Sequence, residues 1–332
     1  MVKISCVIPT YQGPHTLLRS MRSLQQQTLS DFEILVVDNA ADLEIEKLVA
    51  EFNQTAKLPA HYIPEPQLGL HNARHAGARE AKGELLVFTD DDATFDPHWL
   101  ETYANAFTDH PEMVAGGGPV RPCWENPPPV WFIHYLEQTK LNGLLSLMEL
   151  STTFRLDSTV EFFGVNMAIR RATLFEVGGF HPESFGEIWL GDGESGLNRK
   201  LRERQMLIGY LPPAIVYHHI PPDRMTIAYL RQRMANQSAC DLYAYYQAEG
   251  VPPRWRLALD VLRLAIRKKL WLRPLLYRSR TDPHGVDVQL HAAHTFAQAQ
   301  YMLRLIYNNS FRALIRQKDW LKSENLNHGA AS

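Results

Sequence analysis

The amino-acid sequence predicts an α/β fold in which a mostly parallel sheet is flanked by helices and followed by a helical C-terminal extension. Short apolar runs of strand length alternate with helical segments up to residue 118. This alternation is typical of parallel sheets with helices on both faces. Two of the apolar runs lead into acidic residues, at the edge where open α/β sheets bind ligands. After Pro222 the strand pattern stops and only helical patterns remain.

The first strands and helices follow one another at short spacing. Apolar runs predict strands at residues 4–8, 33–38, 61–63, 85–88 and 113–118. Between them, apolar residues at helical spacing predict helices at 14–24, 43–52, 70–82 and 97–107. Pro14 suits the first turn of its helix, because proline lacks the amide hydrogen that the first turn leaves unpaired. This order is that of a nucleotide-binding α/β sheet.

The regular pattern is interrupted at residues 119–159, which begin with a proline-rich stretch containing Trp124 and Trp131. We interpret this segment as an acceptor-side insertion or lid and expect it to be the least regular part of the first domain. Beyond it we expect a strand at 161–170, a short helix ending at Gly178 and Gly179, a helix at 193–204 and a strand at 214–217. The sequence thus predicts a first domain over 1–222 and a helical extension over 223–332.

Composition argues against several classes of protein. The formal net charge is −2 over 332 residues, so no global field would recruit nucleic acid. Cys6, Cys123 and Cys240 have no paired spacing, which argues against a disulfide framework and against a zinc site. No apolar run approaches the ~20 residues of a membrane span, and the N-terminus does not resemble a signal peptide. We therefore expect a cytoplasmic protein.

Residues 254–280 are strongly basic. They contain nine arginines and lysines against one acidic residue, Asp260, and are interleaved with apolar residues that include Trp255 and Trp271. A helix of this kind can lie in the headgroup region of an anionic membrane, as a peripheral contact on the cytoplasmic face. It can equally pack on the main domain with a solvated basic face. The sequence leaves both interpretations open.

Three consecutive aspartates, Asp90, Asp91 and Asp92, follow the apolar run at 85–88. Adjacent carboxylates repel one another unless a positive charge lies between them. A hard divalent cation such as Mn²⁺ or Mg²⁺ takes oxygen ligands and can bridge to a substrate diphosphate. An acidic turn that caps the next helix is the simpler alternative, but the position directly after a buried strand favours a metal site.

Together these motifs resemble family 2 of the inverting nucleotide-sugar glycosyltransferases, which have the type-A glycosyltransferase fold. The resemblance implies that Pro9, Thr10 and Tyr11, which close the first strand, lie against the nucleotide of the donor. It also implies that Asp38, at the end of the second strand, hydrogen-bonds the nucleobase. Arg74 would then point towards the donor phosphates or ribose.

The aspartate triplet resembles the acidic metal motif of this family. By that resemblance Asp90 touches the donor sugar or ribose, Asp91 belongs to the same donor-binding turn, and Asp92 binds the metal that bridges the diphosphate. Gly164 and Asn166 resemble the segment that lines the donor-sugar and acceptor pocket.

A later acidic segment resembles the catalytic motif of the family at the start of a helix. The basic–leucine pair downstream aligns Glu194 with the catalytic base, and Asp192 lies nearby as the alternative. The helix dipole would favour the ionised carboxylate that a base needs, while simple helix capping is the structural alternative. The last strand resembles the family's closing strand, whose histidine supplies a further metal ligand. Strand alternation allows only one of His218 and His219 to face the metal.

The resemblance covers residues 3 to about 233, with Asn39 where the family usually has a second aspartate and His75 where asparagine is common. It implies metal-dependent, inverting transfer of a sugar from a nucleoside-diphosphate sugar to a glycan or lipid-linked acceptor, as in bacterial cell-surface polysaccharide assembly. A nucleotidyltransferase is one alternative, but residues 12–15 lack the glycine-rich, basic loop expected of that class. A non-catalytic nucleotide-sugar-binding protein is the other, and the retained acidic motifs count against it.

Overall fold

The computed structural model describes residues 3–139, 141–182, 184–185, 188–189, 191–267, 281–317 and 319–321. Within these residues the centre is a sheet with the strand order β3-β2-β1-β4-β9-β6-β12-β8. Only β9 and β8 run against the common strand direction. The strands are β1 (Ile4–Thr10), β2 (Phe32–Asp38), β3 (Ala60–Pro64), β4 (Leu85–Phe88), β6 (Met113–Gly117), β8 (Arg155–Asp157), β9 (Met167–Arg170) and β12 (Leu207–Tyr210). The predicted mostly parallel α/β sheet is confirmed.

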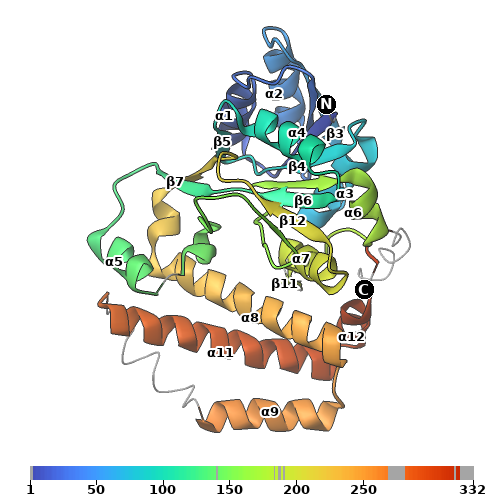
Figure 1. Ribbon diagram of the computed structural model, residues 1–332. Helices are drawn as coiled ribbons and strands as arrows, with labels where there is room; N and C mark the ends of the chain where they lie inside the picture. Colours follow the sequence, from blue (N-terminus) through green and yellow to red (C-terminus); the bar gives the residue numbers. More distant parts are fainter. Residues whose placement is uncertain are drawn as a thin grey trace.

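The sheet is buried on both faces, because successive side chains of a strand point to opposite sides. In β1, Cys6 and Ile8 belong to the core on one face and Val7 to the core on the other. Helices α1 (Pro14–Leu24), α2 (Leu43–Asn53) and α4 (Trp99–Asp109) contribute to the first core. Helices α3 (Leu70–Glu80), α6 (Arg171–Glu176) and α7 (Gly193–Glu203) contribute to the second (Figure 1).

A smaller sheet brings distant parts of the chain next to the aspartate triplet. Strand β13 (Val216–Ile220) pairs antiparallel with β5 (Ala93–Phe95) and parallel with β7 (Val120–Trp124). In this register His218 lies opposite Ala93, the residue that follows Asp92. A two-stranded ribbon, β10 (Ser184–Phe185) with β11 (Ile188–Trp189), precedes α7.

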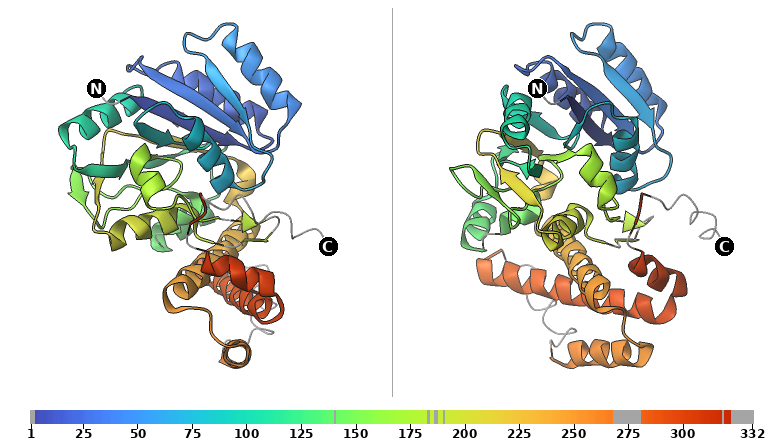
Figure 2. Two further views of the ribbon diagram at one scale, coloured as in Figure 1. Left: turned by 90° about the vertical axis from the view of Figure 1, so that its right-hand side faces the viewer. Right: turned by 45° about the vertical axis from the view of Figure 1, so that its right-hand side comes forward.

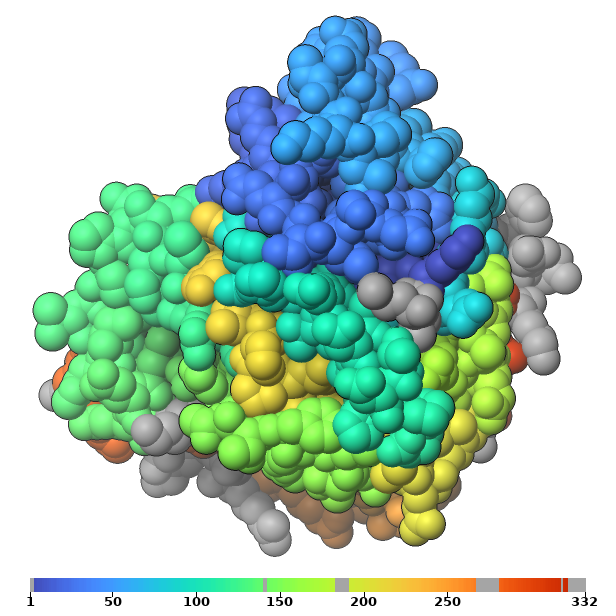
Figure 3. All heavy atoms as spheres, turned by 45° about the horizontal axis from the view of Figure 1, so that its top comes forward, coloured from blue at the N-terminus to red at the C-terminus, as the bar shows by residue number. Residues whose placement is uncertain are grey.

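Residues 119–159 are more regular than expected. They contain β7, helix α5 (Val130–Thr139), the 3₁₀ helix η1 (Leu141–Leu145) and β8. Because β7 pairs with β13 and β8 pairs with β12, both ends of this segment belong to sheets. Only the part around α5 projects, and its green atoms form a lobe at one side of the molecule (Figure 3).

Two other expectations needed correction. The strand expected at 161–170 is confined to β9, because residues 161–166 form a loop in which Asn166 bonds to neighbouring segments. The last strand, expected at 214–217, begins two residues later and includes both histidines within β13. Strand β12 was not predicted, since it is a four-residue run with a glycine at its third position.

The C-terminal extension is helical, as predicted. After the 3₁₀ turn η2 (Pro222–Met225) it contains α8 (Ile227–Glu249), α9 (Arg254–Arg267), α11 (Pro283–Tyr307) and α12 (Asn309–Arg316). These helices share a core of their own that includes Leu242, Tyr301, Leu305 and Phe311. They lie as a layer beneath the sheet, with α9 outermost (Figures 1 and 2). No helix in the described part of the chain is long and apolar enough to cross a bilayer. The second half of the basic segment, 268–280, lies outside the described residues.

Candidate functional site

A cavity of about 670 Å³ opens at the carboxyl ends of β1 and β4. The turn after β1 and the aspartate triplet form one side of it, and β13 with the start of the helical extension forms the other. Its lining includes Pro9, Thr10, Tyr11, Asn39, Asp90, Asp91, Asp92, Ser146, His218, Arg224, Tyr229 and Arg233. The structure therefore brings together most of the residues expected to contact the donor and the metal.

The three aspartates have different surroundings. Asp91 is turned back to β1, where its Oδ2 accepts a hydrogen bond of 2.5 Å from the Thr10 hydroxyl. Burial raises the pKa of Asp91 to about 7, against the opposing effect of that hydrogen bond, and the two neighbouring carboxylates add to the rise. Asp90 is partly exposed and faces Arg74, with 3.4 Å between Oδ1 and Nη2. Asp91 thus stabilises the turn, while Asp90 is open to a ligand.

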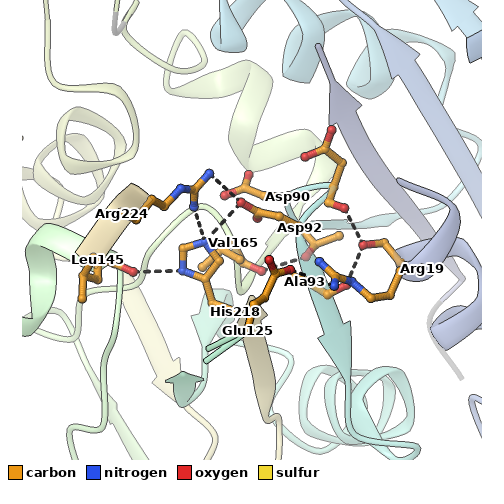
Figure 4. Close-up of polar contacts among 12 residues, drawn as sticks. Arg19, Asp90, Asp92, Ala93, Glu125, Leu145, Val165, His218 and Arg224 are labelled. Carbon is orange, nitrogen blue, oxygen red and sulfur yellow. Dashed lines mark hydrogen bonds and ion pairs between the residues drawn. The ribbon is translucent and has the colours of Figure 1, made fainter. Parts of the chain in front are cut away.

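Asp92 lies in a cluster with His218 and Arg224, and Figure 4 shows the three side chains pointing towards one another. Asp92 Oδ2 is 2.9 Å from Arg224 Nη2 and 3.4 Å from His218 Nε2. Burial alone would raise the pKa of Asp92, but its contacts with His218 and with the guanidinium of Arg224 hold it at about 2. Asp92 therefore carries a negative charge at neutral pH.

Strand alternation in β13 separates the two histidines. His218 is buried on the cavity side, and its Nδ1 lies 2.9 Å from the carbonyl oxygen of Leu145. That carbonyl can only accept, so the proton is on Nδ1, and the lone pair of Nε2 accepts a hydrogen bond of 3.0 Å from Arg224 Nη1 beside Asp92. His219 points to the other side, where its Nε2 lies 3.0 Å from the hydroxyl of Thr94. Of the two candidates, His218 is the one placed next to Asp92.

The side chains in this cluster fit a divalent cation. Asp92 Oδ1 is buried and has no hydrogen-bond partner among the described residues. A carboxylate oxygen suits Mg²⁺ or Mn²⁺, and a neutral imidazole nitrogen is a common metal ligand. Within the described residues no group of three or more His, Cys, Asp or Glu side chains is arranged to hold a metal. The chain would thus supply only part of the coordination, as is usual where substrate phosphates and water supply the rest.

Arg74 joins the donor side of the cavity to the acidic start of α7. Its buried guanidinium lies 3.4 Å from Asp90 and 3.5 Å from Glu194, and it packs over the ring of Phe180 at 5.3 Å. Gly164 makes this position possible, because a side chain at 164 would collide with the guanidinium group. The absence of a side chain at Gly164 thus leaves room for Arg74 to lie between the carboxylates of Asp90 and Glu194.

Gly164→Ala is expected to lower the free energy of unfolding by about 1–3 kcal/mol, because the added methyl group overpacks the buried Arg74. Chemical denaturation measures this change. Gly143→Ala is the matched control, since a methyl group at 143 would meet only Phe163 at an ordinary 3.5 Å. We expect that control to change stability by no more than about 0.5 kcal/mol. Equal stability of the two variants would contradict the close packing of Arg74 on Gly164.

Glu194 and Asp192, the two candidate bases, differ in how far their carboxylates are already engaged. Asp192 is buried, with Oδ1 2.8 Å from His181 Nδ1 and Oδ2 2.6 Å from Arg199 Nη1. Burial would raise the pKa of Asp192, but the contacts with His181 and Arg199 lower it. Although Asp192 stands at the N-cap of α7, its side chain makes no capping hydrogen bond. Glu194, in the first turn of α7, is 21% exposed and faces the site through Arg74.

Of the predicted donor residues, Asp38, Arg74, Gly164 and Asn166 do not line the cavity. Asp38 is fully buried, and its carboxylate accepts hydrogen bonds from the amides of Ala40 and Asp42 and from the hydroxyl of Tyr62. Its neighbour Asn39 lines the cavity instead. Asp38 therefore shapes the turn that presents Asn39, and this arrangement does not favour the expected direct contact with a nucleobase.

Asn166 is fully buried and holds four segments of the chain together. Its Oδ1 accepts from the indole of Trp99 and the hydroxyl of Tyr103, and its Nδ2 donates to the carbonyls of Pro119 and Ala214. All four hydrogen-bonding positions of an asparagine amide are thereby used. The geometry assigns Asn166 to the framework of the site, which does not favour the expected contact with the donor.

Several lining residues were not singled out as site residues from the sequence: Asn39, Ser146, Arg224, Tyr229 and Arg233. Arg224 follows the histidine pair by a few residues, and this proximity was the available signal. Tyr229 and Arg233 lie one turn apart on α8, in the helical extension, and spacing within that helix does not relate them to the aspartates. Two cationic side chains from beyond residue 222 thus face the acidic triplet.

Comparison with known proteins relates the chain to sugar transferases. A family model described as glycosyl transferase family 2 matches residues 5–178. A glucosyl-dolichyl phosphate glucuronosyltransferase from Haloferax volcanii is 26% identical over 181 residues, which are 54% of this chain and 56% of that protein. Chondroitin synthase from Escherichia coli is 24% identical over 257 residues, 67% of this chain and 35% of that protein. The chain therefore spans about half the length, or less, of these curated relatives.

A solved structure is similar over most of the chain. It is the mannosyltransferase PcManGT from Pyrobaculum calidifontis, in complex with GDP-Man and Mn²⁺. The two structures superpose with a TM-score of 0.54 at 18% sequence identity, covering 94% of this chain and 84% of the other. At this level of identity the similarity establishes a shared fold.

Proposed function

The chain belongs to glycosyltransferase family 2 and has the type-A glycosyltransferase fold, and from this premise we propose that it transfers a sugar from a nucleoside-diphosphate sugar to an acceptor hydroxyl. The observation that carries the proposal is the link Asp90–Arg74–Glu194. In this link the Arg74 guanidinium lies between Asp90 of the triplet and the partly buried carboxylate of Glu194, in the first turn of α7. A base and a donor site must be this close for a direct displacement.

The donor would lie in the cavity at the carboxyl ends of β1 and β4. The nucleotide would contact the turn formed by Pro9, Thr10 and Tyr11 together with Asn39, and the diphosphate would lie between the triplet and the cations on the opposite wall. Arg224 and Arg233 are placed to neutralise the charge that develops on the leaving diphosphate. Arg224 and Arg233 thus add two cations to Arg74, the arginine expected from the sequence to contact the donor phosphates.

Asp92 and His218 would hold the divalent cation, with Asp92 Oδ1 and His218 Nε2 as the ligand atoms, and Nε2 would exchange its hydrogen bond from Arg224 for the cation. The cation, when bound, neutralises charge on the leaving diphosphate. The hydrogen bond from Nδ1 of His218 to the Leu145 carbonyl fixes the orientation of the imidazole. Fixing the ligand in this way lowers the entropic cost of binding.

Glu194 would act as the base in a single displacement. As the acceptor oxygen bonds to the anomeric carbon, its proton passes to the Glu194 carboxylate and the bond from that carbon to the diphosphate oxygen breaks. One displacement inverts the anomeric configuration. Arg74 lies against the same carboxylate and orients it. Asp192 would instead hold the start of α7 in place through His181 and Arg199.

A glycan or lipid-linked acceptor is the class proposed here. Ser146 and the start of α8 line one side of the cavity, where such an acceptor would approach. The Haloferax volcanii relative is a glucosyl-dolichyl phosphate glucuronosyltransferase, which supports a lipid-linked acceptor here. We place the reaction in the cytoplasm, in bacterial cell-surface glycan assembly. The three free cysteines suit a reducing compartment.

The direct test is release of nucleoside diphosphate from a panel of nucleotide sugars with Mn²⁺ or Mg²⁺ and varied acceptors. We expect release with one donor, loss of release on chelation with EDTA, and recovery when metal is restored. Nuclear magnetic resonance of the product would show the opposite anomeric configuration to the donor. No release with any donor in either metal would overturn the proposed activity, and a retained configuration would overturn the single displacement.

A further inference from the structure

Helix α9 carries an apolar stripe on the side that faces away from the protein. Trp255, Leu259, Leu262 and Ile266 are 67%, 42%, 55% and 68% exposed. At 3.6 residues per turn, side chains spaced by four, three and four residues fall within an arc of about 60° on one face. Isolated exposed apolar residues are common on soluble proteins, but a continuous stripe of four large ones marks an interaction site.

The opposite side of the same helix already supplies its packing. Leu257 is fully buried, and Val261 and Leu264 pack against the core formed by α8, α11 and α12. These three residues lie on the face opposite Trp255 and Ile266. The protein core therefore holds α9 in place without using the outward stripe, and the stripe is available to a second surface.

Arginines border the outward stripe on both of its sides. At 100° per residue, Arg256 and Arg263 fall along one edge and Arg254 along the other. All three are exposed. Arg263 also pairs with Asp260, the single acidic residue of the helix. A central apolar stripe with cationic edges fits a helix that lies in the plane of a bilayer, with its apolar side chains among the acyl chains and its arginines at the phosphates.

The position of α9 permits such a contact. It forms the outermost layer of the helical extension, on the far side of α11 from the sheet (Figures 1 and 2). Its long axis runs along the surface of the molecule, so the stripe can meet a flat surface along the whole helix. Burial of two or three large apolar side chains would combine with the attraction of several arginines to anionic headgroups.

We propose that the outward face of α9, made by Trp255, Leu259, Leu262 and Ile266 with their bordering arginines, docks the protein on a membrane surface that contains anionic lipids. A second copy of the chain is the competing occupant. Packing two such stripes against each other would bring the bordering arginines of both copies together, and that repulsion favours the lipid surface. The contact does not depend on the sugar-transfer proposal, and either can fail alone.

Flotation of the full-length protein with vesicles tests this docking. We expect the protein to float with vesicles of phosphatidylcholine and phosphatidylglycerol, and much less with phosphatidylcholine alone. High salt should weaken binding, because the cationic edges contribute through screened charge. Trp255→Ser combined with Ile266→Ser should weaken vesicle binding by roughly tenfold or more for each lost side chain. Because both residues are exposed, circular dichroism and thermal unfolding should be unchanged.

Leu43→Ser is the matched control, since Leu43 is an equally exposed apolar residue at the start of α2, in the α/β part of the chain. It should float like the unchanged protein. Absence of flotation with the anionic vesicles would overturn the proposal, as would equal flotation of the double variant and the control. Dimerisation of the unchanged protein in light scattering, abolished by the double variant and unaffected by vesicles, would assign the stripe to a second copy instead.

Discussion

Glu194→Gln is expected to slow sugar transfer by roughly 10²–10⁴-fold, the range that a positioned general base contributes, while donor affinity stays nearly unchanged. Glutamine keeps the shape of the side chain and can still contact Arg74, but its amide cannot take a proton from the acceptor. Because Glu194 is linked to the donor side through Arg74, its replacement should leave the nucleotide and metal contacts in place. Single-turnover kinetics measure transfer, and calorimetry with the donor measures binding.

Glu203→Gln is the matched control, because Glu203 is an exposed residue at the other end of the same helix. We expect it to transfer sugar at the unchanged rate. Normal transfer by Glu194→Gln would contradict the assignment of the base. If Asp192→Asn were then folded but inactive, the role would pass to Asp192. That outcome is not expected, since both oxygens of Asp192 are engaged by His181 and Arg199.

The fold was predictable where strands are long and buried on both faces. A short apolar run flanked by helical segments, such as the one ending at Phe88, is typical of a strand buried in a parallel sheet. The alternation of such runs with helical segments therefore predicts the order of strands and helices along the chain. Strands β7, β8 and β12 were missed or misjudged because each is short and is held by partners far away in the sequence. The residues within each of these strands do not indicate such distant partners. In addition, the proline-rich start of residues 119–159 resembles a loop.

The site was predictable to the level of motifs but not of side-chain direction. The sequence predicts that one of two adjacent histidines faces the metal, but only the structure shows that His218 is the one beside Asp92. The same limit applies at the end of β2, where Asp38 turns into the protein and Asn39 faces the cavity. Arg224 reaches Asp92 by tertiary packing of the extension, which no spacing within either motif encodes.

Asp92→Ala is expected to weaken metal-dependent donor binding by more than about a hundredfold. Removing a group that only orients a metal ligand typically costs 10–100-fold in affinity, and Asp92 would be a ligand itself. Its Oδ1 is the buried carboxylate oxygen without a partner in the described residues, and the substitution removes it. Calorimetry with Mn²⁺ and a nucleoside diphosphate, each with and without the other, measures the loss directly.

Asp31→Ala is the control, because Asp31 is an exposed aspartate in the turn before β2. It should bind metal and donor as the unchanged protein does. Residual binding of the nucleoside diphosphate by Asp92→Ala in the absence of metal is also expected, since Arg224 and Arg233 still line the cavity and Arg224 has lost its acidic partner. Undiminished metal-dependent binding in Asp92→Ala would contradict the metal assignment. Loss of all diphosphate binding with the fold intact would instead show that Asp92 positions Arg224, and that the cationic wall depends on the triplet.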